Sequence, residues 1–66
     1  MTVKELTEIC YEPFFYIEES IVIDVVRTVG IFDRRDVLSG NIPQWLAGAQ
    51  VERIKIIDEN TIGIRV

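Results

Sequence analysis

The chain has 66 residues, of which 48% are hydrophobic and 27% charged, and it carries a net charge of −4 with one cysteine and no histidine. This length predicts a single domain, residues 1–66, and domains of this size usually need a disulfide, a metal or a partner chain to supplement a small core. A lone cysteine excludes an internal disulfide, and a chain without histidine or a second thiol lacks the usual zinc ligands. Tight packing and association with another protein remain as sources of stability.

The N-terminal segment MTVKELTEIC is acidic where a secretory signal would place lysine or arginine before an apolar core. The apolar runs are also much shorter than the roughly 20 residues that a membrane-spanning helix needs. We therefore expect a cytoplasmic location, no membrane contact and a free Cys10 thiol.

The first predicted element is a helix of about nine or ten residues that begins after Thr2. Thr2 and Glu5 have the spacing of a capping box, and Pro13 ends the helix because the residue before a proline avoids helical angles. A helix this short needs a packing surface. The apolar residues that recur at helical spacing, and that would face the rest of the protein, are Val3, Leu6, Ile9 and Cys10.

The segment FFYIEESIVIDVVRTVGIF, residues 14–32, fits two structures. A helix from Ser20 to Gly30 would place Asp24 and Arg27 opposite an apolar side. However, seven of the nine residues from Ile21 to Val29 are Ile, Val or Thr, which favour strands and lose side-chain freedom in helices. We favour two strands, at about 14–18 and 21–29, joined at Glu19–Ser20, while the helical alternative stays open.

Three elements are predicted for the rest of the chain. RRDVLSG supplies a short strand through Val37 and Leu38, and NIPQWLAGA forms a short helix that begins at Pro43 and ends at Gly48. The last 16 residues form a hairpin around the turn DEN, residues 58–60. The predicted fold is therefore α+β: a small antiparallel sheet of two hairpins with a short N-terminal helix and a second short helix.

The C-terminal hairpin is predicted to have one apolar and one basic face. With Ile57 opposite Thr61, Arg53 lies opposite Arg65, and Lys55 shares their face. Facing like charges are mildly destabilising, so this face is a candidate contact for an anionic partner or nucleic acid. Alternatively, the three side chains extend into water or meet Glu18, Glu19 or Asp24 from the other hairpin. The net charge disfavours nucleic-acid binding. The apolar face collects Ile54, Ile56, Ile62, Ile64 and Val66.

Exposed aromatic residues are the other candidate site. Phe14 and Phe15 are adjacent and point to opposite faces of a strand, so one of them is left outside a single-layer core. Exposed aromatic residues are typical of protein-binding hot spots. We therefore predict a protein-binding surface with charged neighbours that set approach and partner choice, although the two helices could instead cover both faces of the sheet. The predicted surface comprises Phe14, Phe15, Trp45, Glu18 and Glu19.

No catalytic pattern is visible in the sequence. Without histidine, Cys10 has no partner that would activate it, and its place on an apolar helix face makes it core filler. The neighbouring acids Glu18 and Glu19 point to opposite sides of a strand, and the glycines form no phosphate-binding loop. We expect a protein that is not an enzyme and has no metal and no cofactor.

Both ends of the chain resemble small accessory proteins of bacterial phages and prophages. The resemblance rests on Thr2–Leu6, TVKEL, and on residues 42–66, with the pattern of an IP..L helical turn followed by V..I.I.DE and a final strand. It implies a mobile-element origin, a bacterial host cell, and a role like that of anti-CRISPR inhibitors, which occupy host defence or regulatory proteins. No functional residue can be carried over from it.

Taken together, these features predict a non-catalytic module that covers the surface of a host protein. The alternative is a structural domain that associates with copies of itself. A third possibility is a weak nucleic-acid contact through Arg53, Lys55 and Arg65.

Overall fold

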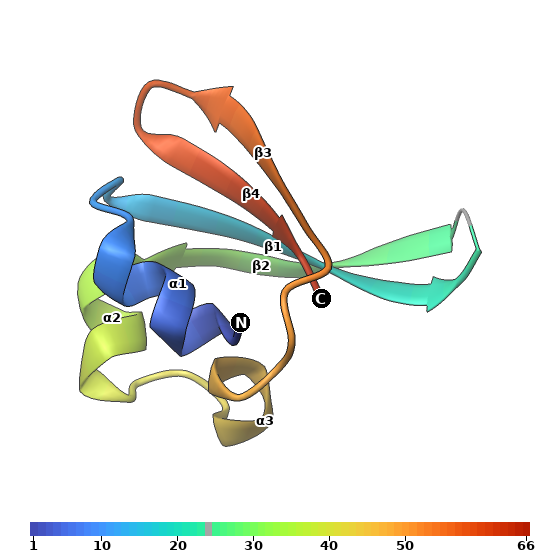
Figure 1. The fold of residues 1–66 in the computed structure, drawn as a ribbon, viewed down its shortest axis with the longest axis horizontal. Helices are drawn as coiled ribbons and strands as arrows, with labels where there is room; N and C mark the ends of the chain where they lie inside the picture. The colour runs from blue at the N-terminus through green and yellow to red at the C-terminus, as the bar shows by residue number, and fades with distance from the viewer. Residues whose placement is uncertain (24) are drawn as a thin grey trace.

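The computed structural model describes residues 1–23 and 25–66, which form an α+β fold, as predicted (Figure 1). The chain begins with a helix, continues with a hairpin and two further helices, and ends with a second hairpin. In order, the elements are α1 (Val3–Ile9), β1 (Phe14–Val22), β2 (Val25–Asp33), α2 (Arg34–Ser39), α3 (Gln44–Ala47), β3 (Arg53–Asp58) and β4 (Thr61–Arg65).

The four strands form one mixed sheet in the order β2-β1-β4-β3. The two predicted hairpins are present, since β1–β2 and β3–β4 are antiparallel, but β1 and β4 pair in parallel. The prediction of a wholly antiparallel sheet was therefore wrong. The parallel pair aligns Phe15 with Ile62 and Ile17 with Ile64, which buries these four side chains on one face of the sheet.

The hydrophobic core lies between that face and the three helices. Phe15 and Ile17 of β1 are fully buried, and side chains from every helix join them in one cluster. Because side chains alternate along a strand, the neighbours of Phe15 and Ile17 on β1 point to the other side of the sheet. The other members of the cluster are Val3, Leu6, Val37, Ile42, Leu46, Ile62 and Ile64.

The capping box of α1 is confirmed, but the helix is shorter than predicted. The Glu5 N–H donates to Thr2 Oγ1 at 3.2 Å, and the Thr2 N–H donates to Glu5 Oε1 at 2.9 Å. The helix ends at Ile9, which was predicted to face the core and is instead 61% exposed. Thr7 occupies a buried position in its place, with its hydroxyl donating to the Val3 carbonyl at 2.8 Å.

The strand interpretation of residues 14–32 is confirmed, whereas the predicted turn at Glu19–Ser20 was wrong. The first strand continues through the predicted turn, so that β1 ends at Val22 and β2 starts at Val25. Glu19 is not a turn residue, because it lies opposite Arg27 and forms an ion pair with it at 3.0 Å. Asp24 lies outside the described residues.

Residues 34–39 form the helix α2, so the short strand predicted through Val37 and Leu38 was wrong. Asp33 caps the helix by accepting a hydrogen bond from the Arg35 N–H at 2.8 Å. Gly40 ends it with a left-handed backbone (φ 82°). These two local signals outweigh the strand preference of the apolar pair between them. The predicted short helix of the next segment is confirmed as α3, with Gly48 at its C-terminal end.

The predicted register of the β3–β4 hairpin is confirmed along the strands and wrong at the turn. Arg53 lies opposite Arg65 and Ile54 opposite Ile64, but a bulge at Ile57 places Asp58 opposite Thr61. The predicted apolar face is only half covered. Its β4 members are buried, whereas Ile54 and Ile56 on the edge strand β3 are exposed.

Candidate functional site

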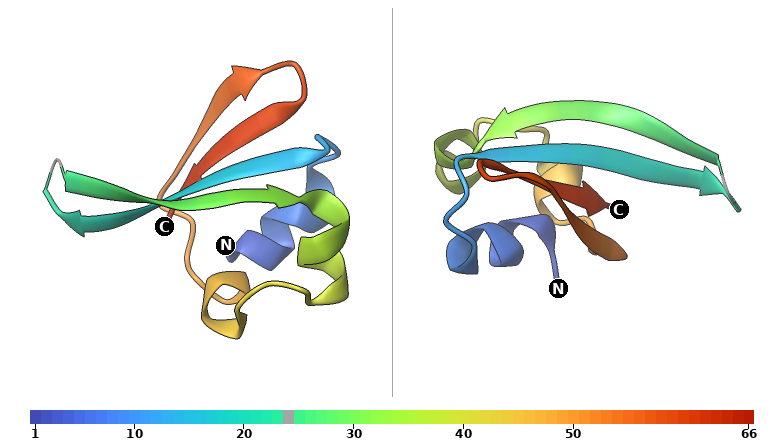
Figure 2. Two further views of the ribbon diagram at one scale, coloured as in Figure 1. Left: turned by 180° about the vertical axis from the view of Figure 1, so that it is seen from behind. Right: turned by 90° about the horizontal axis from the view of Figure 1, so that it is seen from above.

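The β1–β2 hairpin projects beyond the rest of the molecule (Figures 1 and 2). The pairing of β1 with β4 ends at Glu18, opposite Arg65. Next to it, the Ser20 N–H donates to the Val66 carbonyl at 2.8 Å. Beyond this point, β1 and β2 continue as a two-stranded ribbon. We call residues 19–23 and 25–27 the arm.

The arm is apolar and exposed. Ile23 is 90% and Val22 62% exposed, and the other aliphatic side chains beyond the Glu19–Arg27 pair are also exposed. Successive residues of a strand point to opposite faces, so both faces of the ribbon are open to solvent. The aliphatic residues of the arm are Ile21, Val22, Ile23, Val25 and Val26.

Exposed apolar side chains outnumber buried ones across the described part of the chain. Nine hydrophobic residues are buried, whereas 14 large hydrophobic residues are exposed, and five of these 14 lie in the arm. Single exposed aliphatic residues are ordinary on protein surfaces. A contiguous group on a projecting element is instead typical of an interaction site, which makes the arm a candidate site.

The sheet face opposite the core, which we call the outer face, carries no helix among the described residues. Phe14 and Tyr16 of β1 lie on it, and the Tyr16 hydroxyl forms a 2.8 Å hydrogen bond with Thr28 Oγ1 on β2. Phe14 and the neighbouring Ile31 are exposed. The outer face thus combines a small apolar area with the charged cluster described next.

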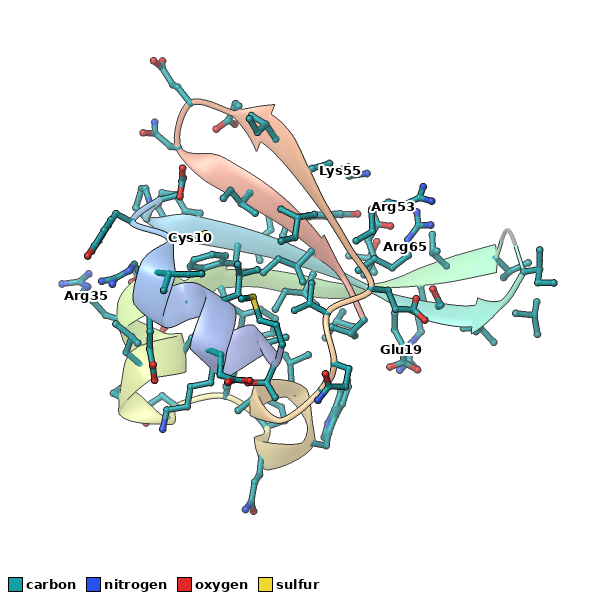
Figure 3. All side chains as sticks on the ribbon, in the orientation of Figure 1. Cys10, Glu19, Arg35, Arg53, Lys55 and Arg65 are labelled. Carbon is teal, nitrogen blue, oxygen red and sulfur yellow. The ribbon has the colours of Figure 1, made fainter. Side chains whose placement is uncertain are left out.

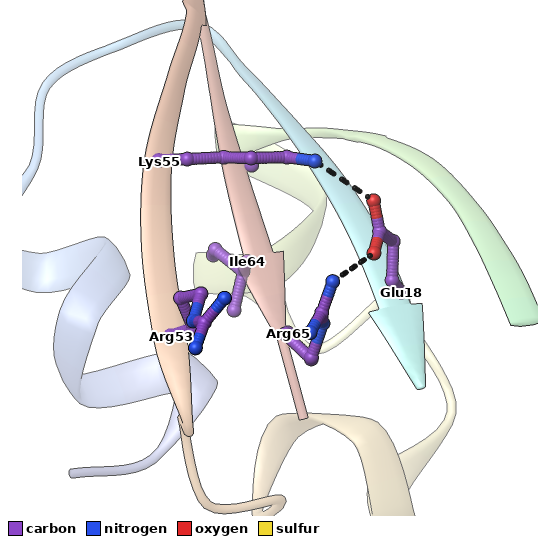
Figure 4. Close-up of a pocket in the computed structure, with 6 residues that line it drawn as sticks. Glu18, Arg53, Lys55, Ile64 and Arg65 are labelled. Carbon is purple, nitrogen blue, oxygen red and sulfur yellow. Dashed lines mark hydrogen bonds and ion pairs between the residues drawn. The ribbon is translucent and has the colours of Figure 1, made fainter. Parts of the chain in front are cut away.

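Glu18 on β1 accepts hydrogen bonds from two cations on the outer face (Figure 4). Lys55 Nζ lies 3.2 Å from Oε1 of Glu18, and Arg65 Nη2 lies 3.3 Å from Oε2. Only 10% of the Glu18 side chain is exposed. The hydrogen bond from Lys55, followed by the one from Arg65, lowers the pKa of Glu18 below its ordinary value of 4.5 despite its burial.

Gly63 makes this ion pair possible. Lys55 lies opposite Gly63 in the β3–β4 pair, and its side chain extends across β4 to reach β1 (Figure 4). A Cβ atom at position 63 would lie 2.8 Å from Cγ of Lys55. The absence of a side chain at Gly63 therefore leaves the space through which the side chain of Lys55 reaches Glu18.

The predicted basic face exists, but Glu18 neutralises part of it. Arg53, Lys55 and Arg65 surround a hollow with about 10 Å³ of free space, enough for about one water molecule. With Glu18 included, the cluster has a net charge of +2, and Arg53 forms no ion pair with the described residues. The hollow is too small to enclose a nucleotide or another substrate-sized group.

The predicted aromatic surface is not one patch. Phe15 is fully buried, so its assignment to a binding surface was wrong. Phe14 is exposed on the outer face, whereas Trp45 is exposed on α3, which covers the opposite face. Glu18 is engaged within the sheet, and Glu19 lies at the base of the arm.

The sequence interpretation missed the aliphatic residues of the arm as candidate binding residues. Their near-continuous run is typical of a strand buried on both faces. The signal that could have shown otherwise is the Glu19–Arg27 pair. A charged cross-strand pair indicates that this level of the hairpin is open to water rather than buried on both faces.

Cys10 lies apart from the basic cluster, near the helical end of the molecule (Figure 3). Burial, together with the negative charge of Glu12, raises the pKa of its thiol above the ordinary 9.0, which disfavours the reactive thiolate. Next to it, Arg34 Nε donates to the Cys10 carbonyl at 2.9 Å, and the guanidinium lies 5.1 Å from the centre of the Tyr11 ring.

Two further features of residues 1–23 and 25–66 bear on the kind of site present. They contain no group of three or more Cys, Asp or Glu side chains that could hold a metal ion. None of their helices is long and apolar enough to cross a membrane.

Comparison with known proteins gave no match to a family model, a curated protein or a solved structure. The resemblance to phage accessory proteins therefore stays a prediction.

Proposed function

We propose that this chain is a non-catalytic protein-binding module and that the arm is its docking element. The observation that carries the proposal is the group of five exposed aliphatic side chains on a ribbon that projects beyond the helices. The core is formed without them, so they are available to a partner.

The physical argument is the free energy gained when the arm is covered. Removing one such side chain from water contributes about 1–3 kcal/mol. A two-stranded ribbon without further support is at best marginally stable in water. A partner that covers the arm would therefore both gain apolar contact and stabilise the hairpin itself.

The chemistry of the arm favours a protein over a nucleic acid. Its one cation among the described residues, Arg27, is paired with Glu19 at 3.0 Å. Nucleic-acid binding depends on unpaired cations that contact phosphates. The resemblance to phage accessory proteins supports a host defence or regulatory protein as one class of partner, and a second copy of the chain is the other class.

A site-specific photo-crosslinker tests this proposal inside cells. It would be placed at Val22 in the arm and, as a matched control, at Ile9 in α1, whose exposed fraction is nearly equal at 61% against 62%. We expect discrete protein adducts from position 22 and none from position 9. Equal adducts from the two positions, or none from position 22, would overturn the proposal.

A further inference from the structure

We infer that the arm packs against the arm of a second copy of the same chain, in a two-fold symmetric dimer. This inference rests on the proposed function, because it names the partner that covers the arm. The most common symmetric contact between identical chains uses the same surface on both. The arm is suited to this contact because apolar side chains on one copy would meet equivalent side chains on the other.

The first argument is area. Five exposed aliphatic side chains, at on the order of 100 Å² each, give roughly 500 Å² of apolar surface on one arm. Two arms together bring on the order of 1,000 Å², which reaches the lower limit for a specific interface.

The second argument is shape. Two-stranded ribbons twist more strongly than wide sheets, and the β1–β2 ribbon is visibly twisted between the sheet and the arm in Figure 1. The pairing of the arm is irregular between Ser20 and Val22, where its register shifts. A twisted ribbon that is open on both faces can coil around an identical ribbon.

The third argument is charge. Each copy carries a net charge of −4, so two copies repel each other over most of their surface. Within residues 19–27, the sequence has two acids, Glu19 and Asp24, and one base, Arg27. The arm is therefore nearly neutral, and two copies can meet there with little repulsion. This predicts a dimer that becomes tighter as salt screens the remaining charges.

Sedimentation of the purified full chain tests the inference. The wild type would be compared with Val22→Thr/Val25→Thr, which removes apolar surface from the arm while keeping β-branched residues that favour strands. The matched control is Ile54→Thr/Ile56→Thr, which makes the same kind of change at two exposed positions of the edge strand β3. Circular dichroism would establish that each variant is folded.

We expect the wild type and the control to sediment at the mass of two chains, with dissociation constants that fall as salt is raised. The arm variant should dissociate about tenfold or more readily. If the arm variant does not fold, a photo-crosslinker at Val22 in the purified wild type replaces it, and an adduct of two chains is expected. A wild type that stays monomeric up to millimolar concentration would overturn the inference. An equal loss of association in the control would also overturn it.

This outcome is separable from that of the proposed function. A monomer in solution whose arm forms adducts with a different protein in cells overturns the self-pairing and leaves the docking role of the arm in place. An arm that forms no adduct in either setting overturns both.

Discussion

The side chain of Lys55 lies across Gly63 and ends 3.2 Å from the carboxylate of Glu18, so that one ion pair connects the β3–β4 hairpin to β1. This ion pair reinforces the parallel pair β1–β4, which is the only strand pairing between the two hairpins within the described sheet. The carboxylate is largely buried and also binds Arg65. This cluster therefore holds together the part of the sheet from which the arm projects.

The first prediction concerns the space above Gly63 that the side chain of Lys55 occupies. In Gly63→Ala, the new methyl group would lie 2.8 Å from Cγ of Lys55 and 3.1 Å from Cδ1 of Ile57. Both side chains would have to move, and we expect a loss of about 1–3 kcal/mol in the free energy of unfolding. Urea denaturation monitored by circular dichroism measures it.

The matched control is Gly48→Ala at the end of α3. There the nearest atom to a new Cβ is 3.8 Å away and the backbone is right-handed helical. This variant should be neutral or stabilised by up to about 1 kcal/mol. A Gly63→Ala protein as stable as Gly48→Ala would contradict the proposed path of Lys55.

The second prediction separates two neighbouring acids. Glu18→Gln removes a largely buried charge that binds two cations, and it should cost about 1–3 kcal/mol in the free energy of unfolding. Glu19→Gln removes only the exposed pair with Arg27 at the base of the arm, which should cost about 0.5 kcal/mol. Thermal denaturation of the two variants side by side measures the difference. Equal costs would show that the Glu18 cluster does not stabilise the sheet.

The third prediction concerns pH. Because the folded protein lowers the pKa of Glu18 below 4.5, ionised Glu18 stabilises the fold fully above that value, and this contribution is lost as the pH falls through the lowered pKa. The stability difference between wild type and Glu18→Gln should therefore be constant near pH 7 and shrink below pH 4.5. Denaturation from pH 7 to pH 3 measures it. A difference that grows on acidification would contradict the assignment.

Two exposed acids act in the same direction. The hydrogen bonds with Thr2 lower the pKa of Glu5, and those from Arg35 lower the pKa of Asp33. Both lie outside the Glu18 cluster and should affect the wild type and Glu18→Gln equally. The comparison between these two proteins therefore isolates Glu18.

The fourth prediction concerns Cys10. Burial raises the pKa of its thiol above the ordinary 9.0, so less thiolate is present at any pH below that value. The thiol of the folded chain should react with iodoacetamide at pH 8 more slowly than that of the chain unfolded in urea. Mass spectrometry of timed samples measures the two rates. A faster reaction in the folded chain would indicate an activated thiol and reopen a chemical role for Cys10.

Local signals in the sequence predicted most of the elements. The Thr2–Glu5 capping box and the β-branched runs on either side of the DEN turn are contained within a few residues, and both gave elements that the structure confirms. The Asp33 and Gly40 caps of α2 were equally local. They were missed because Val37 and Leu38 were interpreted by strand preference alone.

Contacts between distant segments were beyond the sequence interpretation. The parallel pairing of β1 with β4 joins residues more than 40 positions apart, and hydrophobic pattern does not distinguish parallel from antiparallel neighbours. The burial of Phe15 and the exposure of Ile23 both follow from where β4 ends along β1. The sequence therefore showed that surplus apolar surface exists and placed part of it on Phe14 and Trp45, which are exposed, but it wrongly included Phe15 and missed the arm.

The most direct test of the self-pairing of the arm is hydrogen exchange of its amides at two protein concentrations, one well below and one well above the dimer dissociation constant. We predict that the amides of residues 21–26 exchange more slowly at the higher concentration, while those of β4 exchange at the same rate in both samples. Arm amides that exchange at one rate in both, with protection gained instead at β3 or α3, would show that the chain associates through another surface.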